Sequence, residues 1–200
     1  LDLNIVRVPV GADRRADVAA MEGALSDRTL MLVGSAPCFP YGVIDPIEEI
    51  GELAGANDIW MHVDACVGGY FAPFARMNGV PLPVFDFSVP AVRSMSADLH
   101  KYGYAAKGAS TVFHRTEAQR QHQIFTCDQW PVGTMTTPSA AGTRAGGAIA
   151  SAWAVMHYLG EQGYREKTAQ VIGCREKLER AIAESDDLFV LGQPQLGLIA

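Results

Sequence analysis

Hydrophobic positions recur along this chain in two periods, one typical of helices and one typical of strands. Val18, Met21 and Leu25 follow a helical spacing and predict a helix within residues 14–26. The apolar stretch TLMLVGSA, residues 29–36, is too short for a helix of the same kind and predicts a buried strand. The chain therefore begins with a helix followed by a strand.

The same alternation continues through the rest of the sequence. Residues 45–58 predict a helix with Asp45 as its N-cap and Pro46 at its first position, and IWMHVDA, residues 59–65, predicts the next strand. Further strands are expected at 92–97, 109–115 and 188–192, and further helices at 142–160 and 164–185. Alternating strands and helices indicate an α/β fold with a mostly parallel sheet, covered by helices on both faces, whose ligands bind beyond the carboxyl ends of the strands.

Composition narrows the class of function. The 200 residues are 48% hydrophobic and 19% charged, as expected for a globular chain with one core, and the net charge is -6. Lysine and arginine are scattered along an acidic chain, which disfavours nucleic acid and favours a small-molecule substrate. The four cysteines lie far apart without a CxxC pair, so we expect a protein of the reducing cytoplasm. No apolar run approaches the roughly 18 residues of a membrane span, so we expect no span in this piece. Because the chain begins without methionine and ends in an apolar run, we interpret it as a fragment of a longer enzyme.

The segment HVDAC, residues 62–66, is the first candidate site. Side chains alternate across a strand, so His62, Asp64 and Cys66 are expected on one face. A metal site is one interpretation, although neighbouring positions on one strand rarely surround an ion and no second cluster completes the set. A structural role is another, with Asp64 capping a loop and His62 hydrogen-bonded in the core.

A third interpretation links Asp64 to the loop LHKYGYAAKG, residues 99–108. Pyridoxal phosphate is held by a lysine as a Schiff base, and a carboxylate beside its ring nitrogen keeps that nitrogen protonated. Lys101 could supply the amine and Asp64 the carboxylate. His100 would then be a donor to phosphate or a proton carrier. On this interpretation pyridoxal 5'-phosphate is the cofactor and the site holds no metal.

Four stretches together resemble the sphingosine-1-phosphate lyase family, a branch of the fold-type-I pyridoxal-phosphate enzymes that includes the group II decarboxylases. They are MLVGSAPCFPYGVIDPIEEI, HVDACVGGY, FDFSVPAVRSMSADLHKYGYAAKGAS and AGTRAGGAIASAWAVMHYLGEQGY. The resemblance implies a fold-type-I large domain over residues 1–160 and the start of a small C-terminal α+β domain over 161–200. It also implies a homodimer with shared active sites.

The resemblance assigns roles position by position. For the cofactor, it implies Lys101 as the Schiff-base lysine, Asp64 as the partner of the ring nitrogen, Cys66 as a residue under the ring, and His100 as a phosphate contact and proton carrier. For the substrate, it implies that Tyr41 assists bond cleavage and that Lys107 binds the substrate phosphate. It also implies that Thr137, Gly146 and Gly147 contact the cofactor of the neighbouring subunit. The implied reaction is retro-aldol cleavage of a phosphorylated sphingoid base to a fatty aldehyde and phosphoethanolamine.

Departures from the family pattern keep alternatives open. Met135 stands where the family commonly has an aromatic residue, so the amino-acid decarboxylases (carboxy-lyases) of the same branch are the competing prediction. The family's ring-stacking histidine and phosphate-cradling loop lie further upstream than this chain extends. A non-catalytic relative is disfavoured by the retained lysine, aspartate, histidine and tyrosine. A dinucleotide-binding fold is disfavoured because no GxGxxG follows a strand.

Overall fold

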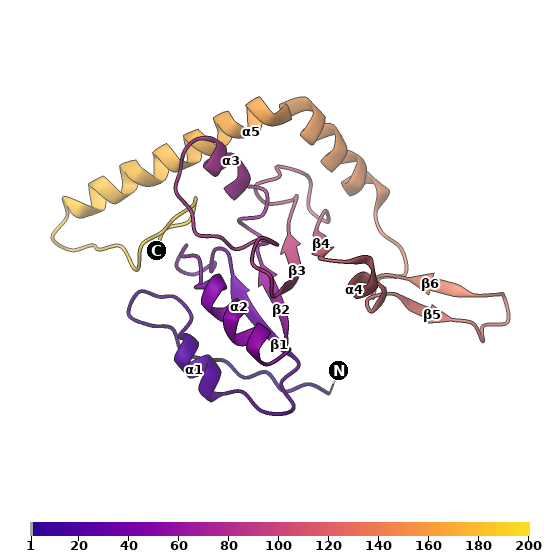
Figure 1. Ribbon diagram of the computed structural model, residues 1–200. Coiled ribbons are helices and arrows are strands. Elements are labelled where there is room, and N and C mark those ends of the chain that lie inside the picture. Colours follow the sequence, from indigo (N-terminus) through magenta and orange to yellow (C-terminus); the bar gives the residue numbers. More distant parts are fainter. Residues whose placement is uncertain (1) are drawn as a thin grey trace.

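The computed structural model describes residues 2–200. Its central sheet contains β1 (Met31–Ser35), β2 (Trp60–Asp64), β3 (Val92–Ala97) and β4 (Thr111–His114), in that order across the sheet (Figure 1). The first three strands are parallel, and β4 is antiparallel to β3. The predicted mostly parallel sheet is therefore present, and the carboxyl ends of β1, β2 and β3 meet at one edge.

The helices of the described residues differ greatly in length. They are α1 (Val18–Gly23), α2 (Ile47–Ala56), α3 (Ala72–Met77), α4 (Glu117–Gln121) and α5 (Gly146–Ala183). The first helix is shorter than the predicted 14–26, and it starts where the Asp17 carboxylate accepts a hydrogen bond from the Ala20 N–H. In Figure 1, α2 lies across the strands, and α3 lies between the sheet and the long helix α5.

One hydrophobic core joins the sheet to these helices. Met61 and Val63 of β2 are fully buried and pack in one cluster with Ile47 and Ile50 of α2. Ile172 of the second half of α5 belongs to the same cluster. Burial of each such aliphatic side chain contributes about 1.5–3 kcal/mol to the stability of the fold. This core therefore holds the strands in place against α2 and α5.

The opposite face of the sheet is exposed along β1 within the described residues. Met31 and Val33 of β1 point to this face and are 48% and 49% exposed. The expectation of helices on both faces is therefore wrong for residues 2–200. Alternation along β1 could show which residues share a face, but it could not show whether this segment supplies a second helical layer.

Asp45 does not cap α2 as the sequence predicts. Pro46 is the cap residue and makes no side-chain capping bond. The buried Asp45 carboxylate instead accepts hydrogen bonds from the backbone N–H groups of Ala16 and Ser35, at 2.9 and 2.7 Å. Burial raises the pKa of Asp45, and those two backbone hydrogen bonds oppose the rise. Asp45 thus connects the segment that precedes α1 to the end of β1.

Three segments after the sheet depart from or refine the prediction. The expected helices at 142–160 and 164–185 form one long helix, α5, which is interrupted at Gly160, where φ is 57°. The expected strand at 188–192 does not form, because Leu188 and Phe189 are exposed and have no strand beside them. An unpredicted hairpin of β5 (Phe125–Cys127) and β6 (Met135–Thr137) projects away from the sheet in Figure 1.

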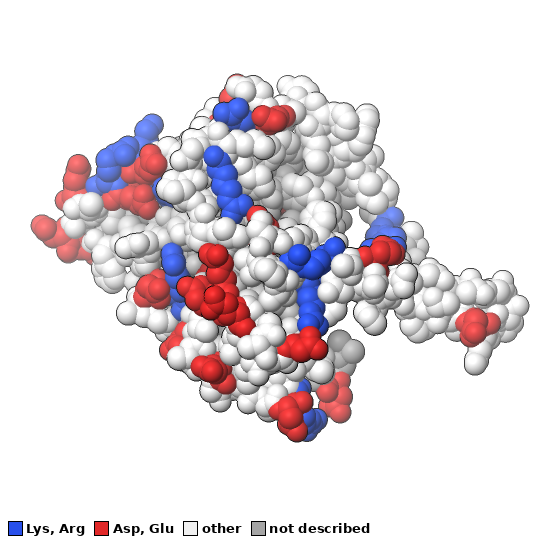
Figure 2. All heavy atoms as spheres, viewed as in Figure 1, with Lys and Arg blue, Asp and Glu red and all other residues white. Residues whose placement is uncertain are grey.

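Charges of both signs are interspersed on the face shown in Figure 2, and no broad area of it carries a single sign. Among the described residues, no helix has both the length and the apolar character required to cross a bilayer. The four cysteines are free.

Candidate functional site

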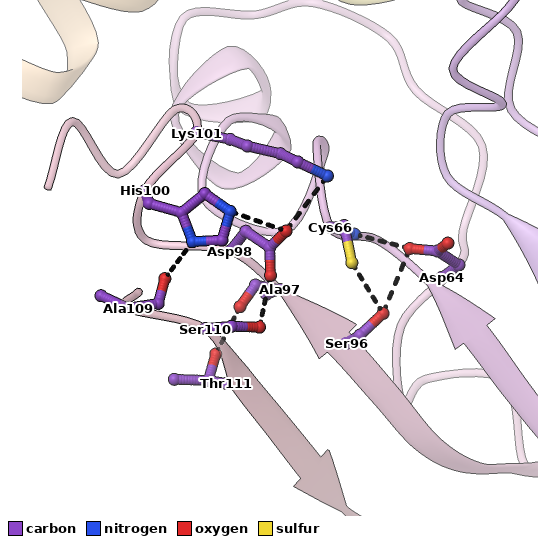
Figure 3. Close-up of polar contacts among 10 residues, drawn as sticks. All are labelled: Asp64, Cys66, Ser96, Ala97, Asp98, His100, Lys101, Ala109, Ser110 and Thr111. Carbon is purple, nitrogen blue, oxygen red and sulfur yellow. Dashed lines mark hydrogen bonds and ion pairs between the residues drawn. The ribbon is translucent and has the colours of Figure 1, made fainter. Parts of the chain in front are cut away.

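Polar side chains gather where β2 and β3 end. Asp64 is the last residue of β2 and lies beside Ser96 of β3 in the parallel register. The Asp64 Oδ1 accepts hydrogen bonds from the Cys66 backbone N–H at 3.0 Å and from the Ser96 hydroxyl at 3.2 Å (Figure 3). The Cys66 thiol donates to the Ser96 Oγ at 3.3 Å. The predicted grouping of Asp64 and Cys66 is therefore present, with Ser96 between them.

These contacts shift the pKa values of Asp64 and Cys66 in opposite directions. Partial burial alone would raise the pKa of Asp64, but hydrogen bonds from Cys66 and Ser96 and the nearby Lys101 charge hold that pKa below its usual value. Burial first, and then the Asp64 carboxylate, raise the pKa of Cys66 to about 11. At neutral pH the cluster thus holds a carboxylate and a protonated thiol.

Lys101 follows β3 in a turn and is held by a second carboxylate. Its Nζ lies 3.1 Å from Oδ2 of Asp98, a residue that is only 6% exposed. In Figure 3 the Lys101 side chain extends from its loop toward the ends of the two strands. The His100 Nε2 lies 3.4 Å from the same Oδ2, and its Nδ1 donates to the Ala109 carbonyl at 2.7 Å. Asp98 therefore joins the predicted lysine and histidine.

Sequence reasoning did not single out Asp98. Burial would raise the pKa of Asp98, but the Ser110 hydroxyl, the Lys101 ammonium and His100 outweigh burial and lower it. Ser110 donates to the other carboxylate oxygen, Oδ1. The signal available in the sequence was an acid three residues before the lysine, where a turn brings both side chains to one side.

His62 lies on the same sheet face as Asp64 but has a different set of partners. Its Nδ1 is 2.8 Å from the Ser94 Oγ, which also accepts a hydrogen bond from the Trp60 indole N–H at 2.8 Å. Burial is the largest cause of the lowered pKa of His62. Within residues 2–200, no group of three or more His, Cys, Asp or Glu is arranged to hold a metal ion.

Tyr41 and Lys107 lie on loops that flank the cluster in sequence. The Tyr41 ring is half-buried, with the Arg14 guanidinium 5.6 Å from its centroid. Lys107 is exposed, and none of the ion pairs found in the described part of the chain includes it. Neither residue has a hydrogen bond to Asp64 or Lys101, so their predicted roles remain predictions.

The residues expected to serve a neighbouring subunit lie outside the cluster. Thr137 is on β6, and its hydroxyl donates to the Ser139 carbonyl at 3.0 Å. Gly146 and Gly147 begin α5 and are exposed. No hydrogen bond within residues 2–200 links any of them to Lys101 or Asp64. Met135, on the same strand as Thr137, is 41% exposed.

Comparisons with known proteins agree on the family. Residues 33–200 match the family described as the pyridoxal-dependent decarboxylase conserved domain. The sphingosine-1-phosphate lyase of Arabidopsis thaliana is 46% identical over 198 residues, which are 99% of this chain and 36% of that protein. The sphingosine-1-phosphate lyase 1 of Rattus norvegicus is 47% identical over 199 residues, covering 99% of this chain and 35% of the relative.

A solved structure gives the same result for the fold. The structure of the Burkholderia pseudomallei sphingosine-1-phosphate lyase superposes with a TM-score of 0.90 and 38% identity, covering 94% of this chain and 43% of that one. The predicted fold-type-I α/β class is confirmed. The chain spans about a third of the length of the curated relatives it matches. The matched residues include Asp64, the Lys101 loop and both halves of α5, and the chain belongs to the pyridoxal-dependent decarboxylase family.

Proposed function

We propose that the chain is the lysine-bearing segment of a pyridoxal-phosphate-dependent carbon–carbon lyase that acts on a phosphorylated sphingoid base. The products would be a fatty aldehyde and phosphoethanolamine. The observation that carries the proposal is the convergence of Asp64 and Lys101 at the carboxyl ends of two neighbouring parallel strands. In open α/β sheets this edge is where ligands bind.

The residues present suit the cofactor. Asp64 keeps a negative charge at neutral pH, which matches a protonated ring nitrogen, and Lys101 offers an amine on the same edge of the sheet. When bound, pyridoxal phosphate accepts the electron pair of the bond that breaks. Asp64 would hold the ring, Lys101 would be the attachment point, and Cys66 would contact the ring. His100 would contact the phosphate, or carry a proton, through Nε2, the imidazole nitrogen that lies near Asp98.

The choice of a lyase depends on Tyr41, Lys107 and the relatives. Retro-aldol cleavage requires removal of a hydroxyl proton, for which Tyr41 would serve, and the cation of Lys107 would bind the substrate phosphate. High identity to sphingosine-1-phosphate lyases of a plant and a mammal supports this substrate class. Amino-acid decarboxylation is the second candidate, favoured by Met135 in place of an aromatic residue.

The proposal includes a homodimer. Thr137, Gly146 and Gly147 would reach the partner's cofactor, which fits a hairpin that projects away from its own sheet. The division into a large domain at 1–160 and the start of a small domain at 161–200 remains part of the proposal.

The test is a product assay on the intact protein loaded with pyridoxal phosphate. Incubation with a phosphorylated sphingoid base should yield a long-chain aldehyde, and incubation with amino acids should release no carbon dioxide. Carbon dioxide without aldehyde would replace the lyase with the decarboxylase and leave the cofactor assignment intact.

A further inference from the structure

The two oxygens of the Asp64 carboxylate have different surroundings. Oδ1 accepts both hydrogen bonds that Asp64 receives, one from the Cys66 N–H and one from the Ser96 hydroxyl. None of the hydrogen bonds formed by residues 2–200 reaches Oδ2. Figure 3 shows both dashed lines ending on the same oxygen. The carboxylate is therefore held from one side, and its other oxygen is available.

The direction of the hydrogen bond from Ser96 follows from chemistry. An ionised carboxylate only accepts, so the single hydroxyl hydrogen of Ser96 must point to Oδ1. A lone pair of the Ser96 Oγ then faces the Cys66 sulfur, 3.3 Å away. The pKa of Cys66, about 11, keeps the thiol protonated, so it can donate to that lone pair. The donors form a short chain from Cys66 through Ser96 to Asp64.

Backbone geometry places Ser96 for this contact. Asp64 and Ser96 are register partners across the parallel pair β2–β3, so their side chains stand next to each other on one face. The next serine of the same face, Ser94, faces His62 and Trp60 instead. The two serines of β3 are thus chemically alike and differ in their partners.

We propose that Ser96 is a positioning residue for the cofactor, which fixes the Asp64 carboxylate through Oδ1 so that Oδ2 is presented to the ring nitrogen. This inference rests on the proposed function, because it requires pyridoxal phosphate as the ligand. Ser96 acts through Asp64 and not by contact with the reacting atoms.

The experiment compares two cofactors on the intact apoprotein: pyridoxal phosphate and the analogue whose ring nitrogen is replaced by carbon. Ser96→Ala should weaken binding of pyridoxal phosphate about threefold to tenfold, the range of one ordinary hydrogen bond, because Ser96 acts on the cofactor only through Asp64. Binding of the carbon analogue should be unchanged, because it has no ring N–H that could donate a hydrogen bond to Asp64. Ser96→Thr, which keeps the hydroxyl, should restore binding of pyridoxal phosphate.

Two further variants separate positioning from a general structural effect. Ser94→Ala removes a hydroxyl from the same strand and should change the affinity for both cofactors alike. In an Asp64→Asn background, Ser96→Ala should cause less than about a twofold further loss, because coupled residues do not contribute additively.

The outcomes distinguish the inference from the function on which it rests. Equal weakening of both cofactors by Ser96→Ala, or unchanged binding of pyridoxal phosphate, would overturn the positioning role and leave the proposed function standing. A wild-type protein that binds neither cofactor would overturn both.

Discussion

The Lys101 ammonium lies 3.1 Å from the Asp98 carboxylate, which is buried and also accepts a hydrogen bond from Ser110. Asp98 and Ser110 stand at the two ends of the loop that contains Lys101. The hydrogen bond from Ser110 to Asp98 therefore closes the loop, and the ion pair with the same carboxylate holds the lysine. Removing one partner of such a buried group leaves the other without compensation.

Asp98→Asn should make the free energy of unfolding less dependent on pH in the acidic range. The folded-state pKa of Asp98 is lowered, so Asp98 contributes stability above its unfolded pKa, about 4, and this stability is lost as the pH falls through the folded value. We expect the variant to be less stable than wild type at pH 7 and the difference to shrink below about pH 4. Chemical denaturation at a series of pH values measures it.

Asp187→Asn, at an exposed residue outside the ion pairs found in residues 2–200, is the matched control for the Asp98 variant. Parallel profiles for wild type and Asp98→Asn would contradict the assignment of the lowered pKa to Asp98.

Borohydride reduction of the intact holoprotein should attach the cofactor irreversibly to Lys101. The reason is that the Lys101 side chain extends toward the ends of β2 and β3 and pairs with Asp98, whereas no ion pair within residues 2–200 includes Lys107. Peptide mapping after reduction identifies the labelled residue. Lys107→Ala should keep the label, Lys101→Ala should lose it, and the reverse pattern would exchange the two roles.

Asp64→Asn should leave the cofactor bound and nearly abolish turnover. An amide does not carry the negative charge that keeps a ring nitrogen protonated, so the cofactor becomes a poor electron acceptor. Cofactor content by visible absorbance and turnover by product assay are measured on the same preparation. Turnover close to wild type with Asn at this position would remove Asp64 from the electron-sink role.

Lys107→Ala should reduce the preference for phosphorylated over unphosphorylated substrate by about tenfold to a hundredfold, the value of one charge-assisted contact. Steady-state kinetics with phosphorylated and unphosphorylated substrate measures this preference. Lys177→Ala, a helix-surface variant, controls for loss of charge, and unchanged selectivity in Lys107→Ala would rule out phosphate binding by that lysine.

Tyr41→Phe should lower kcat with little change in substrate affinity, as expected for a group that acts in the transition state. The same steady-state kinetics measures both quantities.

Mixing Lys101→Ala subunits with Thr137→Ala subunits should recover part of the activity that each variant lacks alone. If Thr137 serves the partner's cofactor, some mixed dimers contain one site with both native residues. Activity is measured after subunit exchange, with dimer formation confirmed by sedimentation. Mixed dimers without any recovery would place Thr137 in its own subunit's site or outside both.

Some of the site could be predicted from the sequence because its residues stand at fixed places relative to strand ends. Asp64 closes a strand of clear alternation, and Lys101 follows the next strand, so parallel pairing had to bring them to one edge. Asp98 was not predicted, because its role depends on a turn that folds its carboxylate onto Lys101 and Ser110. A turn of this kind has no periodicity to reveal it.

The failed predictions have physical causes of the same sort. Residues 188–192 are apolar enough for a strand, but a strand also needs a free sheet edge beside it. Asp45 had the right position for an N-cap, but its carboxylate instead accepts buried hydrogen bonds from two backbone N–H groups, one in β1 and one in the segment before α1. Local propensity predicts what a residue can do, and tertiary contacts select among these options.

The backbone next to Tyr41 is held by residues far away in sequence. The Gln195 side chain accepts a hydrogen bond from the Ile44 N–H at 2.8 Å, and the Gln195 N–H donates to the Gly42 carbonyl at 3.1 Å. Gly42 has a φ of 69°, and a Cβ there would lie 2.3 Å from the Leu198 carbonyl oxygen. During synthesis, the Tyr41 loop leaves the ribosome about 150 residues before these contacts exist, at roughly 5–20 residues per second. The Tyr41 loop therefore spends about 8–30 seconds of synthesis without the contacts that Gln195 and Leu198 supply in the complete fold.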